Sequence, residues 1–553
     1  MSPKPLNRPR RPAEPFAGRW VAKVRGKVVG QGGTPRQALL AAKTARSKEI
    51  PQVEYIPLNM TTQLPEIVQR VNAALPPGQE IYLVGGAVRD LLLGRQVKDF
   101  DFLVPENAIQ IGRRVANALG TGFYPLDVSR DFGRVLIGEG SNRLILDFIR
   151  FQGNDLDEDL MARDLSINAI AIDLRQPDAL LDPCGGVGDL LAHRVKACSP
   201  TSFSSDPVRI IRAVRMAAAF GMRIEAGTRA QMKAAVSGLP SVSPERLRDE
   251  FVKLLAVPKP GTSIRALDLL GALEVIFPEI KPLRKLEQPS PHAFDVWNHI
   301  LQVLKRLDQI LELLGDGVGA EGAGDMQSGL IAQKLGRYRK QFNEHLEIEL
   351  VPDHSRLALL YFATLFHDVG KGKTQSRDET GRIHFYDHEN VGAAMVAERG
   401  RALHLSNDES EVLERIIKHH GRPYLLTKES APPRRRAIYR FFRDTGSTGI
   451  EICLLSLADF MGKFDAQVPQ DELGKHLDTL RTLLEAYFEH ANEQVSPPIL
   501  VNGEDLMREL GLKPGPKIGE LLEAVREAQA AGEVGDKVGA LELARRMIEG
   551  LRE

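Results

Sequence analysis

Two aspartates placed two positions apart, Asp99 and Asp101, are the residues whose types and spacing most directly indicate chemistry. They alternate with Phe100 and Phe102, and in a strand this alternation puts both carboxylates on one face and both rings on the other. Neighbouring carboxylates repel each other unless a cation lies between them. Hard oxygen ligands of this kind suit Mg²⁺, which bridges protein carboxylates and nucleotide phosphates in many enzymes. A strand with one solvated polar face explains the same pattern without any chemistry.

The segment before the aspartates offers a way to bind phosphate. A short apolar run, residues 81–84, is typical of a buried strand and stops at Gly85 and Gly86. Neither glycine has a Cβ, so the backbone can turn sharply and approach a ligand closely. Residues 88–93 predict a helix whose first N–H groups could face a phosphate. With this turn, a metal–nucleotide site and a plain surface strand become evenly matched interpretations.

The two segments together, LVGGAVRDLLLG and KDFDFLV, resemble the nucleotidyltransferase signature of class II CCA-adding enzymes and bacterial poly(A) polymerases. The resemblance implies an α+β fold, with a polymerase-β-like head built on a mixed sheet. It implies that Asp99 and Asp101 are catalytic and hold Mg²⁺. It also assigns nucleotide binding to three residues of the turn and the following helix: Gly85, Gly86 and Arg89.

The segment RDLSINA, residues 163–169, resembles the RRDFTINA motif of the same family, with Ala162 in place of the first arginine and Leu165 in place of the phenylalanine. The family uses this motif to contact the sugar and triphosphate, which implies that role for Arg163, Asp164 and Asn168. Asp147 lies where folds of this kind often place a third carboxylate. A surface or capping role explains Asp147 equally well.

Asp206 and Arg209 lie one helical turn apart, so their side chains can act as a pair on one face. A carboxylate accepts from the exocyclic amine of cytosine or adenine, and a guanidinium donates to the adjacent ring nitrogen. The pair resembles the base-reading EDxxR motif of the family, with Ser205 in place of the glutamate. Arg212 and Arg215 continue the basic face and complete the predicted nucleotide site. The alternative is a helix that begins at Asp206, with Arg209 at the surface.

A second chemistry is indicated further along the chain. His367 and Asp368, followed by Val-Gly-Lys, resemble the metal site of HD phosphohydrolases. The resemblance implies that the metal ligands are His299, His367, Asp368 and Asp459. It also places His388 and His419 near the substrate. Imidazole and carboxylate ligands together suit Ni²⁺, Mn²⁺ or another transition metal.

Composition bounds the remaining possibilities. A chain of 553 residues is too long for one core and should contain several domains. The formal net charge is zero, so nucleic acid must be bound by local basic patches. We expect no membrane span and no signal peptide, because no apolar run has the required length. Three scattered cysteines fit a reducing cytoplasm.

We therefore expect a nucleotidyltransferase head followed by all-α neck, HD and tail domains. The expected boundaries are 1–55 for a basic, partly disordered N-terminal appendage, 56–197 for the head, 198–262 for a base-reading, RNA-binding neck, 263–495 for an HD domain with a Gly-rich insertion near 314–329, and 496–553 for the tail. The resemblance does not cover the appendage, which is either an RNA-touching ββα unit or a soluble extension. An arginine-rich segment, residues 434–443, could hold phosphates or form a solvated helix face.

The resemblance to class II CCA-adding enzymes implies a transferase that adds CMP and AMP, without a template, to the 3′ end of tRNA or another RNA. The predicted partners are that RNA end, CTP and ATP, with no obligate protein partner, and the HD site could add phosphohydrolase activity on RNA 3′ ends. The alternatives within the family are an A-adding or CC-adding enzyme or a poly(A) polymerase. Alternatives of another class are an HD phosphohydrolase whose head only holds RNA and a non-catalytic RNA-binding protein. The intact aspartate pair argues against these last two.

Overall fold

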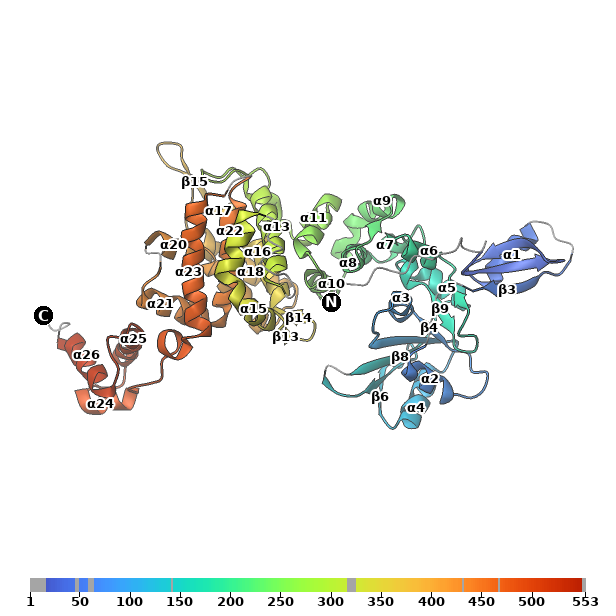
Figure 1. The fold of residues 1–553 in the computed structure, drawn as a ribbon, viewed down its shortest axis with the longest axis horizontal. Coiled ribbons are helices and arrows are strands. Elements are labelled where there is room, and N and C mark those ends of the chain that lie inside the picture. The colour runs from blue at the N-terminus through green and yellow to red at the C-terminus, as the bar shows by residue number, and fades with distance from the viewer. Residues whose placement is uncertain are drawn as a thin grey trace. The chain divides into compact units, whose positions relative to one another are not determined.

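The computed structural model describes residues 16–44, 49–57, 64–140, 143–315, 325–429, 432–465 and 468–549. Its chain divides into two compact units, Met1–Leu239 and Pro240–Glu553 (Figure 1). The expectations for residues 1–15 and for the centre of the Gly-rich insertion, 316–324, lie outside the described residues. Among the helices that the structure describes, none has the length and apolar character that a bilayer-spanning segment requires.

A mixed sheet of seven strands, in the order β10-β9-β4-β5-β8-β7-β6, forms the centre of the first unit. The strands are β4 (Tyr82–Val84), β5 (Asp99–Val104), β6 (Gly122–Asp127), β7 (Phe132–Ile137), β8 (Leu144–Arg150), β9 (Ala171–Asp173) and β10 (Leu180–Leu181). β5 pairs antiparallel with β4 and parallel with β8. Phe102 and Phe148 stack on the face opposite the aspartates, with ring centroids 5.1 Å apart. The mixed sheet confirms the expected fold class.

Short helices and turns surround this sheet and carry the nucleotide motifs. They are α2 (Glu66–Ala73), α3 (Gly86–Leu92), α4 (Ala108–Leu119), α5 (Leu156–Ala162), η2 (Ser166–Asn168), α6 (Gly186–Leu191), α7 (Ser202–Ser205), α8 (Arg209–Phe220) and α9 (Ala226–Ala235). A two-residue parallel ladder, β11 (Arg194–Val195) with β12 (Arg223–Ile224), ties α8 back to the head. The helix after the glycine turn begins at Gly86, two residues earlier than expected, so Gly85 alone makes the turn.

The basic appendage is a three-stranded sheet, in the order β2-β1-β3, covered by one helix. Its elements are β1 (Arg19–Val24), β2 (Lys27–Gly32), α1 (Pro35–Thr44) and β3 (Gln52–Ile56). The hairpin and the helix were expected, whereas β3 was not. Several long-range hydrogen bonds hold this unit to the head. Among them, Trp20 Nε1 donates to Leu180 O at 2.8 Å, and the backbone N–H of Asp182 donates to Gly33 O at 2.7 Å.

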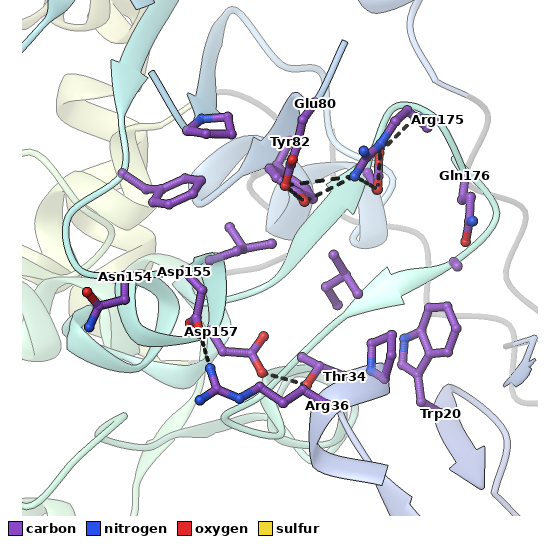
Figure 2. A pocket seen from close by; sticks show the side chains of 17 residues that line it. Trp20, Thr34, Arg36, Glu80, Tyr82, Asn154, Asp155, Asp157, Arg175 and Gln176 are labelled. Carbon is purple, nitrogen blue, oxygen red and sulfur yellow. Dashed lines mark hydrogen bonds and ion pairs between the residues drawn. The ribbon is translucent and has the colours of Figure 1, made fainter. Parts of the chain in front are cut away.

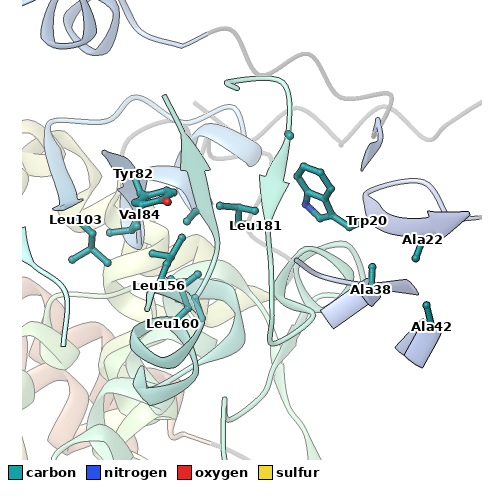
Figure 3. Packing of buried hydrophobic residues seen from close by; sticks show 13 residues of the cluster. Trp20, Ala22, Ala38, Ala42, Tyr82, Val84, Leu103, Leu156, Leu160 and Leu181 are labelled. Atoms are coloured by element: carbon teal, nitrogen blue, oxygen red, sulfur yellow. The ribbon is translucent and has the colours of Figure 1, made fainter. Parts of the chain in front are cut away.

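A shared hydrophobic cluster continues this attachment. Trp20, Ala22 and Ala38 of the appendage belong to the same buried cluster as Tyr82 and Leu103 of the head sheet (Figure 3). The three-stranded sheet is therefore part of the packed first unit and is not a separate module.

A cavity of about 560 Å³ lies beside this attachment, lined by residues of both parts (Figure 2). Its charged groups are already paired: Arg36 with Asp155, and Arg175 with Asp173 at 2.7 Å. Neither Asp99 nor Asp101 lines this cavity, so it is not the predicted nucleotide site.

The second unit is helical apart from two short hairpin ladders. Its elements before the tail are α10 (Pro244–Leu255), α11 (Pro260–Leu270), α12 (Ala272–Ile276), η4 (Pro278–Leu283), α13 (Val296–Leu314), α14 (Met326–Leu335), η6 (Gly336–Tyr338), α15 (Arg339–Leu346), β13 (Glu349–Val351), β14 (His354–Ser355), α16 (Arg356–Phe366), α17 (Lys371–Thr374), β15 (Gln375–Arg377), β16 (Ile383–Phe385), α18 (His388–Ala402), α19 (Asn407–His419), α20 (Arg422–Glu429), α21 (Arg435–Thr445), η7 (Gly446–Thr448), α22 (Gly449–Gly462), α23 (Gln470–Phe488) and η8 (Ala491–Val495). α22 is buried along its whole length, which places any polar residue on it inside the core.

The tail consists of α24 (Gly503–Leu510), α25 (Pro516–Ala530) and α26 (Lys537–Glu549) around a small hydrophobic cluster of its own. Arginines of α21 form ion pairs with glutamates of α25 and the turn after it: Arg440 with Glu527 at 2.6 Å, and Arg436 with Glu533 at 2.6 Å. Three arginines of the arginine-rich segment, Arg436, Arg440 and Arg443, thus form ion pairs with the tail.

The attachment of the appendage can be tested at Gly33. A Cβ at this position would lie 1.5 Å from the carbonyl oxygen of Asp182, so Gly33→Ala must displace the backbone that joins appendage to head. We expect the free energy of unfolding to fall by about 1–3 kcal/mol, the usual cost of overpacking. Gly188→Ala is the matched control, because a Cβ there meets no atom within 4 Å. Equal stability of the two variants in urea unfolding would contradict the described attachment.

Candidate nucleotide and metal sites

The carboxylates of the head are brought together by strand register. Asp101 of β5 lies directly opposite Asp147 of β8, and Asp99 lies two positions away on the same face. Burial raises the pKa of Asp101; Arg163 opposes the shift, while Asp147 and Asp99 add to it. The three like charges fit a divalent cation, because a bound cation would relieve their mutual repulsion.

Asp147 already has a cationic partner. Arg134 of the neighbouring strand β7 donates from Nε and Nη2 to the two carboxylate oxygens, both at 2.8 Å. This bidentate pair fixes the orientation of the Asp147 carboxylate beside Asp101. No local pattern in the sequence indicates Arg134, because only the register of β7 with β8 brings it opposite Asp147.

Gly85 is the point where three predicted segments meet. Its φ of 74° lies in the left-handed region that glycine tolerates. A Cβ there would lie 3.0 Å from Arg163 Nη1 and 3.4 Å from Asp101 Oδ2, so the glycine turn, the RDLSINA segment and the aspartate strand are in contact. Any side chain larger than hydrogen would intrude between the arginine and the carboxylate.

The other residues predicted to bind nucleotide form a hydrogen-bonded chain. Arg89 Nη1 donates to Asn168 Oδ1 at 2.6 Å, and Asn168 Nδ2 donates to Asp164 Oδ1 at 3.2 Å. Arg212 Nη1 of α8 donates to the second oxygen of Asp164 at 3.3 Å. Arg89 is only 8% exposed, so its guanidinium points into the protein. Gly86 is the first residue of α3, and Arg215 lies partly buried on α8.

Asp206 and Arg209 form the predicted pair, with Arg209 Nε 3.6 Å from Asp206 Oδ2. Arg209 Nη1 also donates to the carbonyl oxygens of Ala162 and Ser202, each at 3.2 Å, which holds its guanidinium in place. α8 begins at Arg209, and its N-cap is Val208, with no side-chain capping bond among the described residues. The backbone N–H of Arg209 donates to the carbonyl oxygen of Asp206 at 3.1 Å, so the turn that leads into α8 starts at Asp206, and a helix start and a base-reading pair both remain open for this segment.

In the second unit, three helical segments converge on one buried cluster: α13, the end of α16 and α22. His299 of α13 lies with Nε2 2.9 Å from Asp459 Oδ1 of α22 and 3.6 Å from Asp368 Oδ2. His367 Nε2 lies 3.4 Å from the same Asp368 oxygen. The ligand atoms of His299, His367 and Asp368 lie within 4.8 Å of one another. The four predicted ligands are thus adjacent.

The protonation of the histidines explains why this cluster fits a metal ion. His299 Nδ1 faces the carbonyl oxygen of Gly462 at 3.3 Å, and His367 Nδ1 faces that of Thr364 at 2.8 Å. A carbonyl only accepts, so each Nδ1 carries a proton and each Nε2 is directed toward the carboxylates. A metal ion bound here would take the lone pair of each neutral Nε2, which is the usual arrangement of a metal-binding histidine with its outer hydrogen bond.

Two lysines at the edge of the cluster favour its ionised carboxylates. Burial acts to raise the pKa of Asp368, but Lys371 Nζ at 2.7 Å and His367 hold it well below its usual range. Lys463 Nζ, 3.4 Å from Asp459 Oδ2, acts in the same way on the pKa of that carboxyl, against its burial. The carboxylates are therefore ready to bind a cation at neutral pH.

One residue of this cluster differs from the expectation. His388 Nε2 lies 3.4 Å from Asp368 Oδ1, but its companion is His420, whose Nε2 lies 3.9 Å from the same oxygen, and not His419. The partly exposed His419 lies near Arg422, and burial together with that arginine lowers its pKa to about 4. The sequence did contain the signal, because the apolar stripe of α19 at 412, 413, 416 and 417 continues at position 420.

Comparison with known proteins finds matches for the regions that contain both sites. Family models match the chain as the poly A polymerase head domain over residues 81–196, a probable RNA and SrmB-binding site of polymerase A over 221–283, the HD domain over 296–459, and tRNA nucleotidyltransferase domain 2 over 483–544. The A-adding tRNA nucleotidyltransferase of Deinococcus radiodurans is 32% identical over 86% of this chain and 96% of its own length. The CC-adding tRNA nucleotidyltransferase of Thermus thermophilus is 30% identical, over 83% of this chain and 92% of its own.

A solved structure shows the same fold. The complex of a CCA-adding enzyme with CTP superposes with a TM-score of 0.58 at 22% sequence identity, and the match covers 88% of this chain and 96% of that one.

The buried cluster of the second unit can be tested by metal binding. His367→Ala removes one lone pair, and we expect the affinity for Mn²⁺ or Ni²⁺ at this site to fall at least as far as the roughly 10–100-fold typical of lost outer partners. The matched control is His384→Ala, because His384 lies on the β15–β16 hairpin and pairs with Asp378 at 2.8 Å. Titration calorimetry of both variants should separate them. Undiminished affinity in His367→Ala would show that the cluster is not the metal site.

Proposed function

This chain belongs to the family of tRNA nucleotidyltransferases and poly(A) polymerases, and we propose that it adds CMP and AMP to the 3′ end of tRNA without a template. One observation carries the proposal. A Cβ at Gly85 would lie 3.0 Å from Arg163 Nη1 and 3.4 Å from Asp101 Oδ2, and Asp147 lies opposite Asp101. One site therefore contains two carboxylates, a backbone turn that a phosphate can approach, and the guanidinium of Arg163.

In this proposal Asp99 and Asp101 hold Mg²⁺, with Asp147 as the adjacent carboxylate. The ion, when bound, neutralises triphosphate charge and makes the terminal hydroxyl of the RNA a better nucleophile. The chain supplies the positioning. Gly85 leaves room for the triphosphate, and Arg163 places a cation beside it. Asp164 and Asn168, whose side chains are hydrogen-bonded to each other, are the residues proposed to contact the sugar.

Base choice is proposed to rest on Asp206 and Arg209, together with the basic face formed by Arg212 and Arg215. The carboxylate accepts from the exocyclic amine that cytosine and adenine share, and the guanidinium donates to their ring nitrogen. Uracil and guanine present the opposite pattern at these two positions. The contacts of Arg209 with two backbone carbonyls support a fixed geometry for this recognition.

The cluster of the second unit supports a separate metal-dependent activity. We propose that His299, His367, Asp368 and Asp459 bind Ni²⁺, Mn²⁺ or a related ion and hydrolyse phosphoesters at RNA 3′ ends, with His388 and His420 near the substrate. Such an activity would clear damaged ends before nucleotides are added. We also propose a cytoplasmic setting, in keeping with three cysteines that remain free.

Addition of only part of the CCA sequence is a second candidate function. The names of the two relatives matched over nearly their whole length, one A-adding and one CC-adding, favour it. Extension of tRNA that ends at the discriminator base, with each nucleotide supplied separately and then together, decides between the candidates. Three added nucleotides support full CCA addition, and a product that stops after two, or that starts only from a CC end, supports the second candidate.

The metal assignment in the head predicts the behaviour of Asp101→Asn. Several kcal/mol of transition-state stabilisation should be lost, so we expect the rate of tRNA extension to fall by at least about 100-fold. Asp99→Ala should behave in the same way. The control Asp127→Asn changes an exposed carboxylate of β6 outside the site. Near wild-type extension by Asp101→Asn would refute the assignment.

In Asp101→Asn, the free energy of unfolding should not fall together with the activity. Because burial raises the pKa of Asp101 above its unfolded value, the ionised side chain costs folding free energy at neutral pH. We expect Asp101→Asn to be at least as stable as wild type at pH 7, with the difference shrinking as the pH falls through the raised pKa.

Base recognition predicts different outcomes for the two members of the pair. Asp206→Ala should reduce the use of CTP and ATP and relax rejection of UTP and GTP, because unpaired polar groups cost about 1–3 kcal/mol each. Arg209→Ala should weaken productive binding more severely, since it also leaves the carboxylate unpaired. Steady-state incorporation of the four nucleotides is the measurement, with the exposed Arg229→Ala of α9 as control. Unchanged selectivity in Asp206→Ala would end the recognition hypothesis.

A further inference from the structure

One face of α8 spans the nucleotide site from end to end. Four residues of this face recur at spacings of three or four, and therefore form a single stripe along the helix: Arg209, Arg212, Met216 and Phe220. Arg209 lies beside Asp206, and Arg212 donates a hydrogen bond to Asp164. Met216 and Phe220 both lie against Arg89, which follows the glycine turn.

Phe220, at the far end of this stripe, lies between two guanidinium groups. The Cζ atom of Arg89 is 4.4 Å from the centroid of its ring, and that of Arg95 is 4.5 Å from the same centroid. Both distances are within the range in which an aromatic face attracts a cation. Arg89 is almost fully buried, so this attraction acts with little screening by solvent.

Arg89 in turn fixes the sugar-contacting segment. Its Nε and Nη2 donate to Asp90 at 3.0 and 2.9 Å, and its Nη1 donates to Asn168 at 2.6 Å and approaches Met216 Sδ at 3.4 Å. Asn168 is bonded to Asp164, which returns to α8 through Arg212. The contacts therefore form a closed ring that joins α3, η2 and α8.

We propose that Phe220 is a positioning residue for base selection: by holding Arg89 it fixes the far end of α8, and so the place of Asp206 and Arg209 relative to the rest of the site. This inference rests on the proposed function. Phe220 lies eleven residues, or about 16 Å, along the helix from Arg209. A helix transmits a tilt at one end to the other, and hydrogen bonds to a base edge weaken steeply when their geometry is lost.

The alternative is that Phe220 only fills space next to Arg89. The variant Phe220→Leu separates the two cases, because leucine keeps most of the apolar volume and removes the aromatic face. The variant Phe220→Tyr is the conservative rescue, because tyrosine keeps the aromatic face. A positioning role predicts a change in nucleotide preference for Phe220→Leu and its restoration in Phe220→Tyr. A space-filling role predicts an effect on stability alone.

The matched control is Phe123→Leu. Phe123 also faces a guanidinium, with Arg113 Cζ 5.4 Å from its ring, and it lies on β6, outside the contact ring just described. The same chemical change therefore removes the same kind of contact elsewhere in the first unit. Any general loss of stability should appear in both variants.

The experiment is steady-state incorporation of each of the four nucleotides into tRNA by the full chain, together with thermal unfolding. For Phe220→Leu we expect KM for CTP and ATP to rise about tenfold, with a smaller change in kcat, and discrimination against UTP to fall by a similar factor. Phe123→Leu should keep wild-type discrimination, and Phe220→Tyr should approach it.

Wild-type discrimination in Phe220→Leu would overturn the inference while leaving the proposed function intact. Failure of the wild-type chain to extend tRNA would instead overturn the proposed function. Should Phe220→Leu fail to fold, Arg95→Met removes one of the two cations from the exposed side. It should shift discrimination in the same direction by about two- to fivefold. No shift in that variant would overturn the inference.

Discussion

Repulsion between carboxylates that the sheet register forces together is the constraint on which the head depends. The parallel pairing of β5 with β8 sets Asp101 against Asp147, and the strand period adds Asp99 to the same face. Two arginines offset part of this negative charge: Arg134 pairs with Asp147, and Arg163 acts on Asp101. What remains is a concentration of oxygen ligands that favours a divalent ion.

The glycine turn and the neck helix extend the same site outward. Gly85 keeps the space between Arg163 and Asp101 open, because any Cβ would fill it. From there the ring of contacts through Asn168 and Asp164 leads to α8, whose first residue pairs with Asp206. The residues proposed to recognise phosphate, sugar and base thus belong to one connected set of side chains. The second unit also brings carboxylates together, and there backbone carbonyls hold the Nδ1 protons of His299 and His367 and direct each Nε2 toward the carboxylates.

Local patterns in the sequence predicted those parts of the fold that local physics decides. The alternation around Asp99 predicted the strand and its polar face, and one-turn spacing predicted the pairing of Asp206 with Arg209. Both follow from the geometry of a single element. The resemblance of longer motifs then supplied the roles of the residues and the mixed sheet of the head.

Features that depend on distant residues were not predictable in this way. The pairing of Arg134 with Asp147 requires the register of two strands, and the attachment of Gly33 to Asp182 joins positions far apart in the chain. His419 and His420 are adjacent in sequence, and only the buried face of α19 decides between them.

The most direct test of the central claim is the binding of Mn²⁺ to the head, followed by electron paramagnetic resonance. A His367→Ala background removes the competing site of the second unit. The account predicts that CTP strengthens Mn²⁺ binding in this background and that the further change Asp101→Asn abolishes the nucleotide-dependent binding. Equal binding of Mn²⁺ with CTP before and after the change at Asp101 would contradict the claim that these carboxylates hold the catalytic ion.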